Sequence, residues 1–195
     1  MTLSALGIFS AAGAGGAPAG AYQLISTTIL TGTQGSVSFD VSTLASTYRH
    51  LQLRVVPKTN ENVVISGLRI RLGSPTADSG TNYASHQLFG NNNAVSSSGN
   101  PNETWMFAGT SAGANATGNA FHASVIDLLD AFSSTKFTTM RALYGNPEST
   151  AANSVVGLNS GVWRNTAAVQ TIQLLSTGGA SFVSGSRFSL YGIQG

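Results

Sequence analysis

The sequence predicts an all-β fold, an antiparallel β-sandwich of jelly-roll type that follows a short extended N-terminal arm. Short runs with large apolar side chains at every second position recur from Tyr22 onward, which is the pattern of half-buried strands. Segments rich in Gly, Asn, Ser and Thr separate these runs at the intervals typical of sandwiches and barrels. Only 8% of the 195 residues are charged, against roughly 25% in an average soluble domain. Because the alternating runs begin at Tyr22, we expect an arm at residues 1–21 and a sandwich domain at residues 22–195.

The arm differs in character from the rest of the chain. It is rich in Ala and Gly, and no Lys or Arg precedes Arg49, so the positive region of a signal peptide is missing. Glycines and Pro18 interrupt its apolar residues long before the roughly 20 that a membrane span requires. Such a segment buries too little surface to offset its own backbone entropy. We expect it to dock on another subunit or protein through its large apolar side chains, which are Leu3, Leu6, Ile8 and Phe9.

The domain is expected to contain ten or eleven short strands. The first two, joined by "TGTQ", are expected to form a hairpin. Two later segments, 50–56 and 64–73, show the alternation most clearly, because arginines stand between their large aliphatic residues. The expected strands are 22–30, 35–41, 50–56, 64–73, 82–90, 104–109, 120–129, 136–145, 154–163, 169–175 and 187–193. Residues 73–81, 90–103 and 109–119 are predicted loops, and 40–50 and 126–135 are candidates for short helices.

Residues of the types found in catalytic and metal-binding sites are few and isolated in the sequence. Cysteine is absent, and His50, His86 and His122 lack the spacing of paired metal ligands. We expect structural roles for them, and neither a metal nor a cofactor. Asp127 and Asp130 are three residues apart; capping a turn is the simpler interpretation, and an acid/base pair would need them to face one cleft. The sequence therefore predicts a protein that is not an enzyme.

The charge pattern also limits the partners. The net charge is only +2, and the arginines are scattered along the chain, whereas nucleic-acid binding favours a clustered basic stripe. We expect no nucleic-acid partner and no membrane partner. Trp105 lies between polar loops, and Arg69 and Arg71 are predicted to face outward from their strand. These three residues are the candidates for surface recognition, although packing in the core or at an interface is the alternative for Trp105.

Five phrases of the domain, in order, are "TYRHLQLR" (47–54), "NYASHQLFG" (82–90), "FHASVIDLLD" (121–130), "VGLNSGVWRNTAAVQTIQL" (156–174) and "RFSLYGI" (187–193). Together they resemble a family of small tail-fibre-like or decoration-type virion structural proteins of tailed bacteriophages, especially aquatic ones. The resemblance implies a non-enzymatic sandwich on the particle surface, made in the bacterial cytoplasm, and assembled as a homotrimer with other capsid or tail proteins. Fibre proteins of this type carry a long shaft before the domain, so residues 1–21 favour a short inserted arm.

Two functions follow from these expectations. The first is decoration or cementing of the phage head. The second is a tail, tail-fibre or baseplate-associated module that binds host surface glycan through polar loops and aromatic side chains. A polysaccharide hydrolase would need paired carboxylates, and the sequence does not show them.

Overall fold

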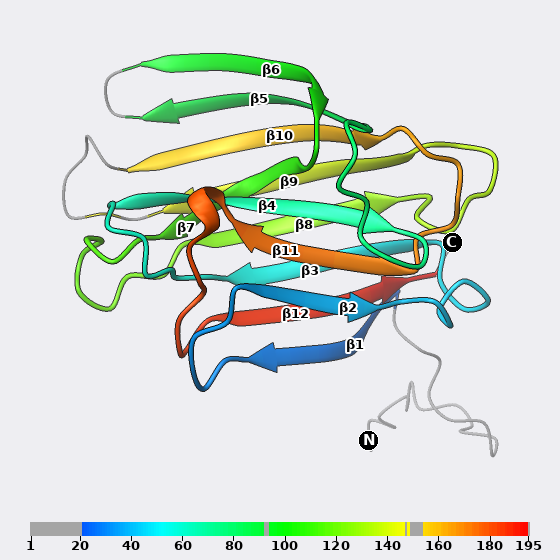
Figure 1. The fold of residues 1–195 in the computed structure, drawn as a ribbon, viewed down its shortest axis with the longest axis horizontal. Coiled ribbons are helices and arrows are strands. Elements are labelled where there is room, and N and C mark those ends of the chain that lie inside the picture. Colours follow the sequence, from blue (N-terminus) through cyan, green and yellow to red (C-terminus); the bar gives the residue numbers. More distant parts are fainter. Residues whose placement is uncertain (1–20, 92–93, 147, 149–153, 195) are drawn as a thin grey trace, which may run out of the picture.

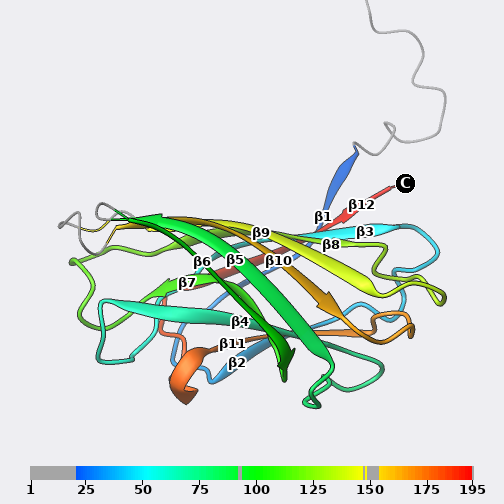
Figure 2. The same cartoon turned by 90° about the horizontal axis from the view of Figure 1, so that it is seen from above.

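The computed structural model describes residues 21–91, 94–146, 148 and 154–194. Twelve strands form two antiparallel sheets that face each other, as Figures 1 and 2 show. The expected β-sandwich is therefore confirmed. The docking residues Leu3, Leu6, Ile8 and Phe9 lie outside the described residues.

The larger sheet has eight strands, and β1 and β6 are its edges. In spatial order they are β1 (Tyr22–Ile29), β12 (Arg187–Ile193), β3 (His50–Val56), β8 (Ala123–Leu129), β9 (Thr138–Asn146), β10 (Val155–Trp163), β5 (Tyr83–Asn91) and β6 (Val95–Glu103). The smaller sheet contains β2 (Ser36–Asp40), β11 (Thr171–Ser176), β4 (Ile65–Gly73) and β7 (Met106–Ala112). A short 3-10 turn, η2 (Thr177–Gly179), follows β11.

The core lies between the two sheets and consists of the inward side chains of the alternating strands. Leu51, Leu53 and Val55 of β3 point inward, as predicted, and so do Leu68, Ile70 and Leu72 of β4. The largest fully buried side chains include Trp163, Tyr83, Phe182 and Phe188. Phe182 and Phe188 meet edge to face, with ring centres 4.9 Å apart.

Two buried aromatic residues also anchor the segment that follows β4. Trp163 donates a hydrogen bond from Nε1 to Oδ2 of Asp78 at 2.9 Å. The Tyr83 hydroxyl lies 3.1 Å from the amide nitrogen of Leu72 and 2.8 Å from its carbonyl oxygen. Burial raises the pKa of Tyr83, so the hydroxyl stays protonated and can both donate and accept.

The expected opening hairpin is wrong. β1 pairs with β12 in the larger sheet, whereas β2 pairs with β11 in the smaller one. The chain crosses between the sheets after β1, where Leu30 donates to the carbonyl of Ser186 and Gln34 exchanges hydrogen bonds with Phe182. Alternation of side chains predicts a strand but does not select its partner, and residues near the C-terminus supply the partners here.

Residues 90–103, predicted as a loop, contain strand β6. It pairs with β5 from Gly90 opposite Val95 to Ser85 opposite Asn100. The sequence of β6 is VSSSGNPNE, which lacks alternating apolar residues because most of the strand is exposed at a sheet edge. The backbone pairing with β5 makes this segment a strand, and the residue pattern does not reveal it.

The two short helices are also absent from the described residues. Residues 41–49 form turns, in which the Asp40 carboxylate accepts a hydrogen bond from the Ser42 amide. The second candidate helix is mostly the end of β8, and Asp130 stops the strand with a φ of 51°. Both segments carry turn-forming side chains that bond to nearby backbone and so compete with helix formation. No helix in the described part of the chain has the length and hydropathy needed to cross a bilayer.

Candidate functional site

The three residues predicted for surface recognition lie together. Arg69 and Arg71 occupy outward positions of β4, and Trp105 lies in the connection between β6 and β7. The Arg69 Cζ atom lies 4.1 Å from the centre of the Trp105 ring, and Arg71 donates from Nε to the carbonyl of Thr104 at 3.0 Å. We call these three residues the Trp105 cluster. Figure 2 shows why they meet, because β6 runs diagonally from the larger sheet toward the level of the smaller one.

The Arg69 guanidinium is held in a partly desolvated position. The pKa of Arg69 is lowered overall, because the effect of burial outweighs the opposite effect of the nearby Glu103 carboxylate. The Nε atom of Arg69 is buried and has no hydrogen-bond partner among the described residues. Stacking on the indole partly compensates for this desolvation, since a cation over Trp is attracted to the ring. The arginine therefore fixes the position of the Trp105 ring.

A small polar pocket opens beside this ring. Its volume is about 60 Å³. It lies at the edge of the sandwich, against the inner faces of β5, β6 and β10, and we call it the Asn159 slot. Its lining residues are Ser85, Gln87, Ser98, Gly99, Asn100, Trp105, Phe107 and Asn159. Of these, the sequence predicted only Trp105, because small polar residues on the inner face of strands resemble ordinary loop residues.

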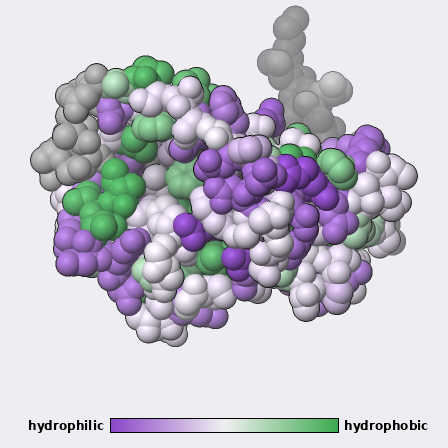
Figure 3. Space-filling model, turned by 45° about the horizontal axis from the view of Figure 1, so that its top comes forward, coloured by the Kyte–Doolittle hydropathy of each residue, from purple (hydrophilic) through white to green (hydrophobic). Residues whose placement is uncertain are grey.

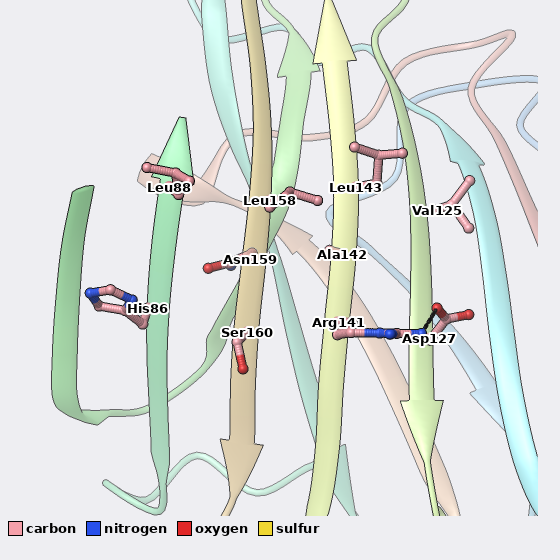
Figure 4. A pocket seen from close by; sticks show the side chains of 10 residues that line it. All are labelled: His86, Leu88, Val125, Asp127, Arg141, Ala142, Leu143, Leu158, Asn159 and Ser160. Atoms are coloured by element: carbon pink, nitrogen blue, oxygen red, sulfur yellow. Dashed lines mark hydrogen bonds and ion pairs between the residues drawn. The ribbon is translucent and has the colours of Figure 1, made fainter. Parts of the chain in front are cut away.

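The outer face of the larger sheet carries an apolar row across four neighbouring strands. Val125 of β8 is paired with Leu143 of β9, Leu143 with Leu158 of β10, and Leu158 with Leu88 of β5. Each of these side chains is more than one-third exposed. Figure 4 shows the row lining a groove of about 550 Å³. Antiparallel sheets usually place polar side chains on the face turned away from the core, so this apolar row is the less usual feature.

A polar row runs beside the apolar one. Arg141 and Asp127 form an ion pair of 3.3 Å, drawn as a dashed line in Figure 4. Asp127 also accepts a hydrogen bond from Gln52 at 2.8 Å. Arg54 donates to Gln52 at 3.0 Å and lies over the ring of Tyr191. Arg54 therefore belongs to the polar row on the larger sheet.

The surface on the side of the smaller sheet differs from the outer face of the larger one. Figure 3 shows the molecule from the side of the smaller sheet and β6, where the surface is largely hydrophilic or neutral. Hydrophobic residues gather on this view mainly at the end where β4 and β10 begin. The apolar row lies on the outer face of the larger sheet, on the opposite side of the sandwich from the smaller sheet.

The aspartates that raised the question of acid/base chemistry have separate partners. Asp127 belongs to the polar row, whereas Asp130 lies in the turn after β8. Hydrogen bonds from Arg49 and Lys136, each 3.0 Å long, lower the pKa of Asp130 to about 2. Asp130 is therefore ionised at neutral pH and engaged in a surface network.

Two of the histidines form hydrogen bonds within the domain, and the third lies on its surface. His50 accepts a hydrogen bond from the Asp130 amide at 2.9 Å, and His86 is exposed on the outer face of β5. His122 is fully buried, with Nε2 3.2 Å from the Glu148 carboxylate. Among the described residues, no three His, Cys, Asp or Glu side chains are grouped as metal ligands.

Comparison with known proteins identifies no relative, since no family model, no curated protein and no solved structure matches this chain. The arrangement of the residues themselves must therefore support any assignment of function.

Proposed function

We propose that the chain is a non-enzymatic structural protein of a bacteriophage virion, an outer-surface module that decorates or cements the head. In this proposal residues 1–21 dock on a neighbouring virion protein through Leu3, Leu6, Ile8 and Phe9. The domain forms a homotrimer on the particle. The observation that carries the proposal is the apolar row on the outer face of the larger sheet.

The apolar row is better suited to an assembly than to an isolated molecule. Its two central side chains, Leu143 and Leu158, are 53% and 55% exposed. Contiguous exposed apolar surface commonly marks a protein–protein contact. Covering it removes apolar area from water at roughly 25 cal/mol per Å². The adjoining Asp127–Arg141 pair would give orientation to such a contact without adding much affinity.

The sheet edges support the same conclusion. β1 and β6 are the edge strands of the larger sheet, and the outer edge of each has no partner among the described strands. Exposed strand edges promote uncontrolled pairing unless they are covered or interrupted. Pro101 within β6 interrupts one of them, because it cannot donate a backbone hydrogen bond. Symmetric packing of copies is a further way to protect the edges.

Weak contacts would be sufficient for a cementing role. A module that touches several capsid subunits at once gains avidity through effective concentration. A modest apolar row and a short arm together can then hold the module on a lattice. This is consistent with a domain in which only 8% of the residues are charged.

The test is the copy number of the chain relative to the major capsid protein in purified particles, measured by quantitative mass spectrometry. A ratio near one, or a simple fraction of it, is expected for decoration of the lattice. A few copies up to a few dozen would instead place the chain at the tail or the vertices and would contradict head decoration. Particles assembled with a chain that lacks residues 1–20 test the arm, since normal loading would contradict docking by this segment.

A second candidate function is the tail, tail-fibre or baseplate-associated module that binds host surface glycan. The specific observation in its favour is that Arg69, Arg71 and Trp105 meet beside a pocket lined by amides and hydroxyls. Aromatic walls combined with a few placed polar groups are typical of small-ligand sites. Binding of host glycan by the isolated full chain, together with a low copy number, would favour this function over head decoration.

A further inference from the structure

The Asn159 slot contains an acceptor that the described residues do not satisfy. Asn159 is only 4% exposed, and its side chain points to the inner face of β10. Its Nδ2 donates to the carbonyl of Phe107. A flipped amide would place two acceptors against each other, so this bond fixes the orientation. The Oδ1 atom is then a buried acceptor without a partner among the described residues.

The large majority of buried polar side-chain atoms in proteins have a hydrogen-bond partner. Seven in the described residues lack one, and of these only Asn159 Oδ1 belongs to a residue that lines the slot. Leaving one unpaired is unfavourable for folding. An unpaired acceptor in a residue that lines a pocket is available to a donor that enters the pocket.

The rest of the slot offers matching groups. Ser85 and Asn100 line it, and their side chains form no hydrogen bond with other described residues. Gln87 donates from Nε2 to the Ser98 hydroxyl at 2.7 Å. Serine hydroxyls and side-chain amides can each donate and accept. This combination suits a ligand group that also does both, which is a hydroxyl.

The remaining walls are aromatic. Phe107 packs edge to face on Tyr144, and Trp105 is held by Arg69. The slot is therefore rigid on one side and polar on the other, which is the composition that recognises the apolar and hydroxyl faces of a sugar. No charged side chain lines the slot, which argues against a phosphate or carboxylate ligand.

We propose that the Asn159 slot binds hydroxyl groups at the edge of a neutral carbohydrate. This inference rests on the second candidate function, glycan binding, and locates it in the molecule. At about 60 Å³ the slot has room for several water-sized groups, since one water needs roughly 10–15 Å³. It thus takes one side of a saccharide unit, with the rest of the glycan outside, along the exposed strand β6.

The two tryptophans provide a direct test. The full chain, labelled with ¹⁵N, has one indole N–H signal from Trp105 at the slot and one from buried Trp163, which is bonded to Asp78. Titration with three neutral probes, methyl α-D-glucopyranoside, methyl β-D-galactopyranoside and N-acetyl-D-glucosamine, is followed by NMR. At least one probe is expected to shift the Trp105 signal in a saturable manner and to leave the Trp163 signal unmoved. A Trp105→Phe variant assigns the two signals.

Neighbouring serines of β6 supply a matched pair of variants. Ser98 lines the slot, whereas Ser97 is paired with the exposed Leu88 on the outer face. Ser98→Ala is expected to weaken binding of the responding probe roughly fivefold, the loss of one typical hydrogen bond. Ser97→Ala is expected to leave the affinity unchanged. Both sites are exposed, so both variants should fold.

The failures can be told apart. A probe can bind without shifting the Trp105 signal, and with the same affinity for the Ser98→Ala variant as for the unchanged chain. In that case glycan binding is supported and the assignment to the slot is overturned. If none of the probes binds, and host glycan added to the full chain does not bind either, the second candidate function fails together with this inference. If the Trp105 signal moves with protein concentration and not with sugar, a second copy fills the slot and the inference is wrong.

Discussion

Leu143 and Leu158 are directly paired across β9 and β10, and both side chains point away from the core. On a strand pair, residues opposite each other on one face lie close enough for their side chains to touch. With Val125 and Leu88 they continue the row over four strands. The row therefore forms a continuous exposed apolar surface across four strands.

The apolar row leads to the first prediction. The double variant Leu143→Thr, Leu158→Thr is expected to remain folded, because Thr favours strands and exposed substitutions usually change stability by less than about 0.5 kcal/mol each. Self-association of the full chain is expected to fall, as measured by analytical ultracentrifugation. Gln173→Thr, on the outer face of the smaller sheet, is the control and should not affect it. Unchanged association in the double variant would show that the row is not the contact surface.

The second prediction concerns the Trp105 cluster. Arg69→Ala removes the guanidinium from the indole ring and is expected to reduce the free energy of unfolding by about 1 kcal/mol. The fluorescence of Trp105 should also change, since its ring loses the group that covers one face. Urea unfolding and emission spectra measure the two effects. Arg187→Ala, an exposed arginine of β12, provides the comparison and should alter neither; a silent Arg69→Ala would mean that the stacking is not maintained in solution.

The third prediction tests the anchoring of the segment after β4. The hydroxyl of Tyr83 bonds to both backbone groups of Leu72 and lies 3.0 Å from the carbonyl of Asp78. Tyr83→Phe is expected to reduce the free energy of unfolding by about 1–3 kcal/mol, because it leaves buried backbone groups unpaired. Thermal or urea unfolding checks this value. Tyr22→Phe, at an exposed tyrosine, should have little effect, and equal effects of the two variants would argue against the bonded role of Tyr83.

The fourth prediction is a dependence of stability on pH. Burial lowers the pKa of His122, although its bond to Glu148 acts in the opposite direction and Lys58 adds to the lowering. The unfolded chain, with a histidine pKa near 6.5, therefore binds a proton more readily than the folded one. Stability is then present above pH 6.5 and declines as the pH falls through that value.

Glu148 extends the decline to more acidic solutions. Its burial raises the pKa, but hydrogen bonds from Thr117 and His122 outweigh this effect and lower it overall. Its contribution is full above the ordinary value of 4.5 and is lost as the pH falls toward the lowered folded value. Urea unfolding at pH 7.5 and 5.5 isolates the histidine. His122→Gln should reduce the difference in stability between these two pH values, whereas His86→Gln, at an exposed site, should retain it. The reverse result would contradict the assignment to His122.

The positions and inward faces of many strands were predictable, because period-two alternation is a local property of the sequence. The inward leucines and outward arginines of β3 and β4 follow directly from their sequences. Strand β6 was missed because its residues are small and polar and do not alternate in hydropathy. The partners of β1 and β2 were wrong because pairing depends on residues far away in the chain.

The candidate site was predictable only in part. Arg69 and Arg71 were identified from their predicted outward direction, and Trp105 was identified as an aromatic residue beside polar loops. Asn159 gave no signal, since one Asn within an alternating strand is common; its importance arises only from the bond to Phe107 and the unpaired Oδ1.

The sequence by itself determined the class of fold, the positions of most strands, the inward residues of the core and the low charge of the chain. The tertiary structure alone decided which strands are neighbours, and so it created the apolar row, the Trp105 cluster and the Asn159 slot. The physical reason is that the orientation of a side chain depends on its own strand, whereas a surface is formed by several strands whose order is set by long-range backbone hydrogen bonds.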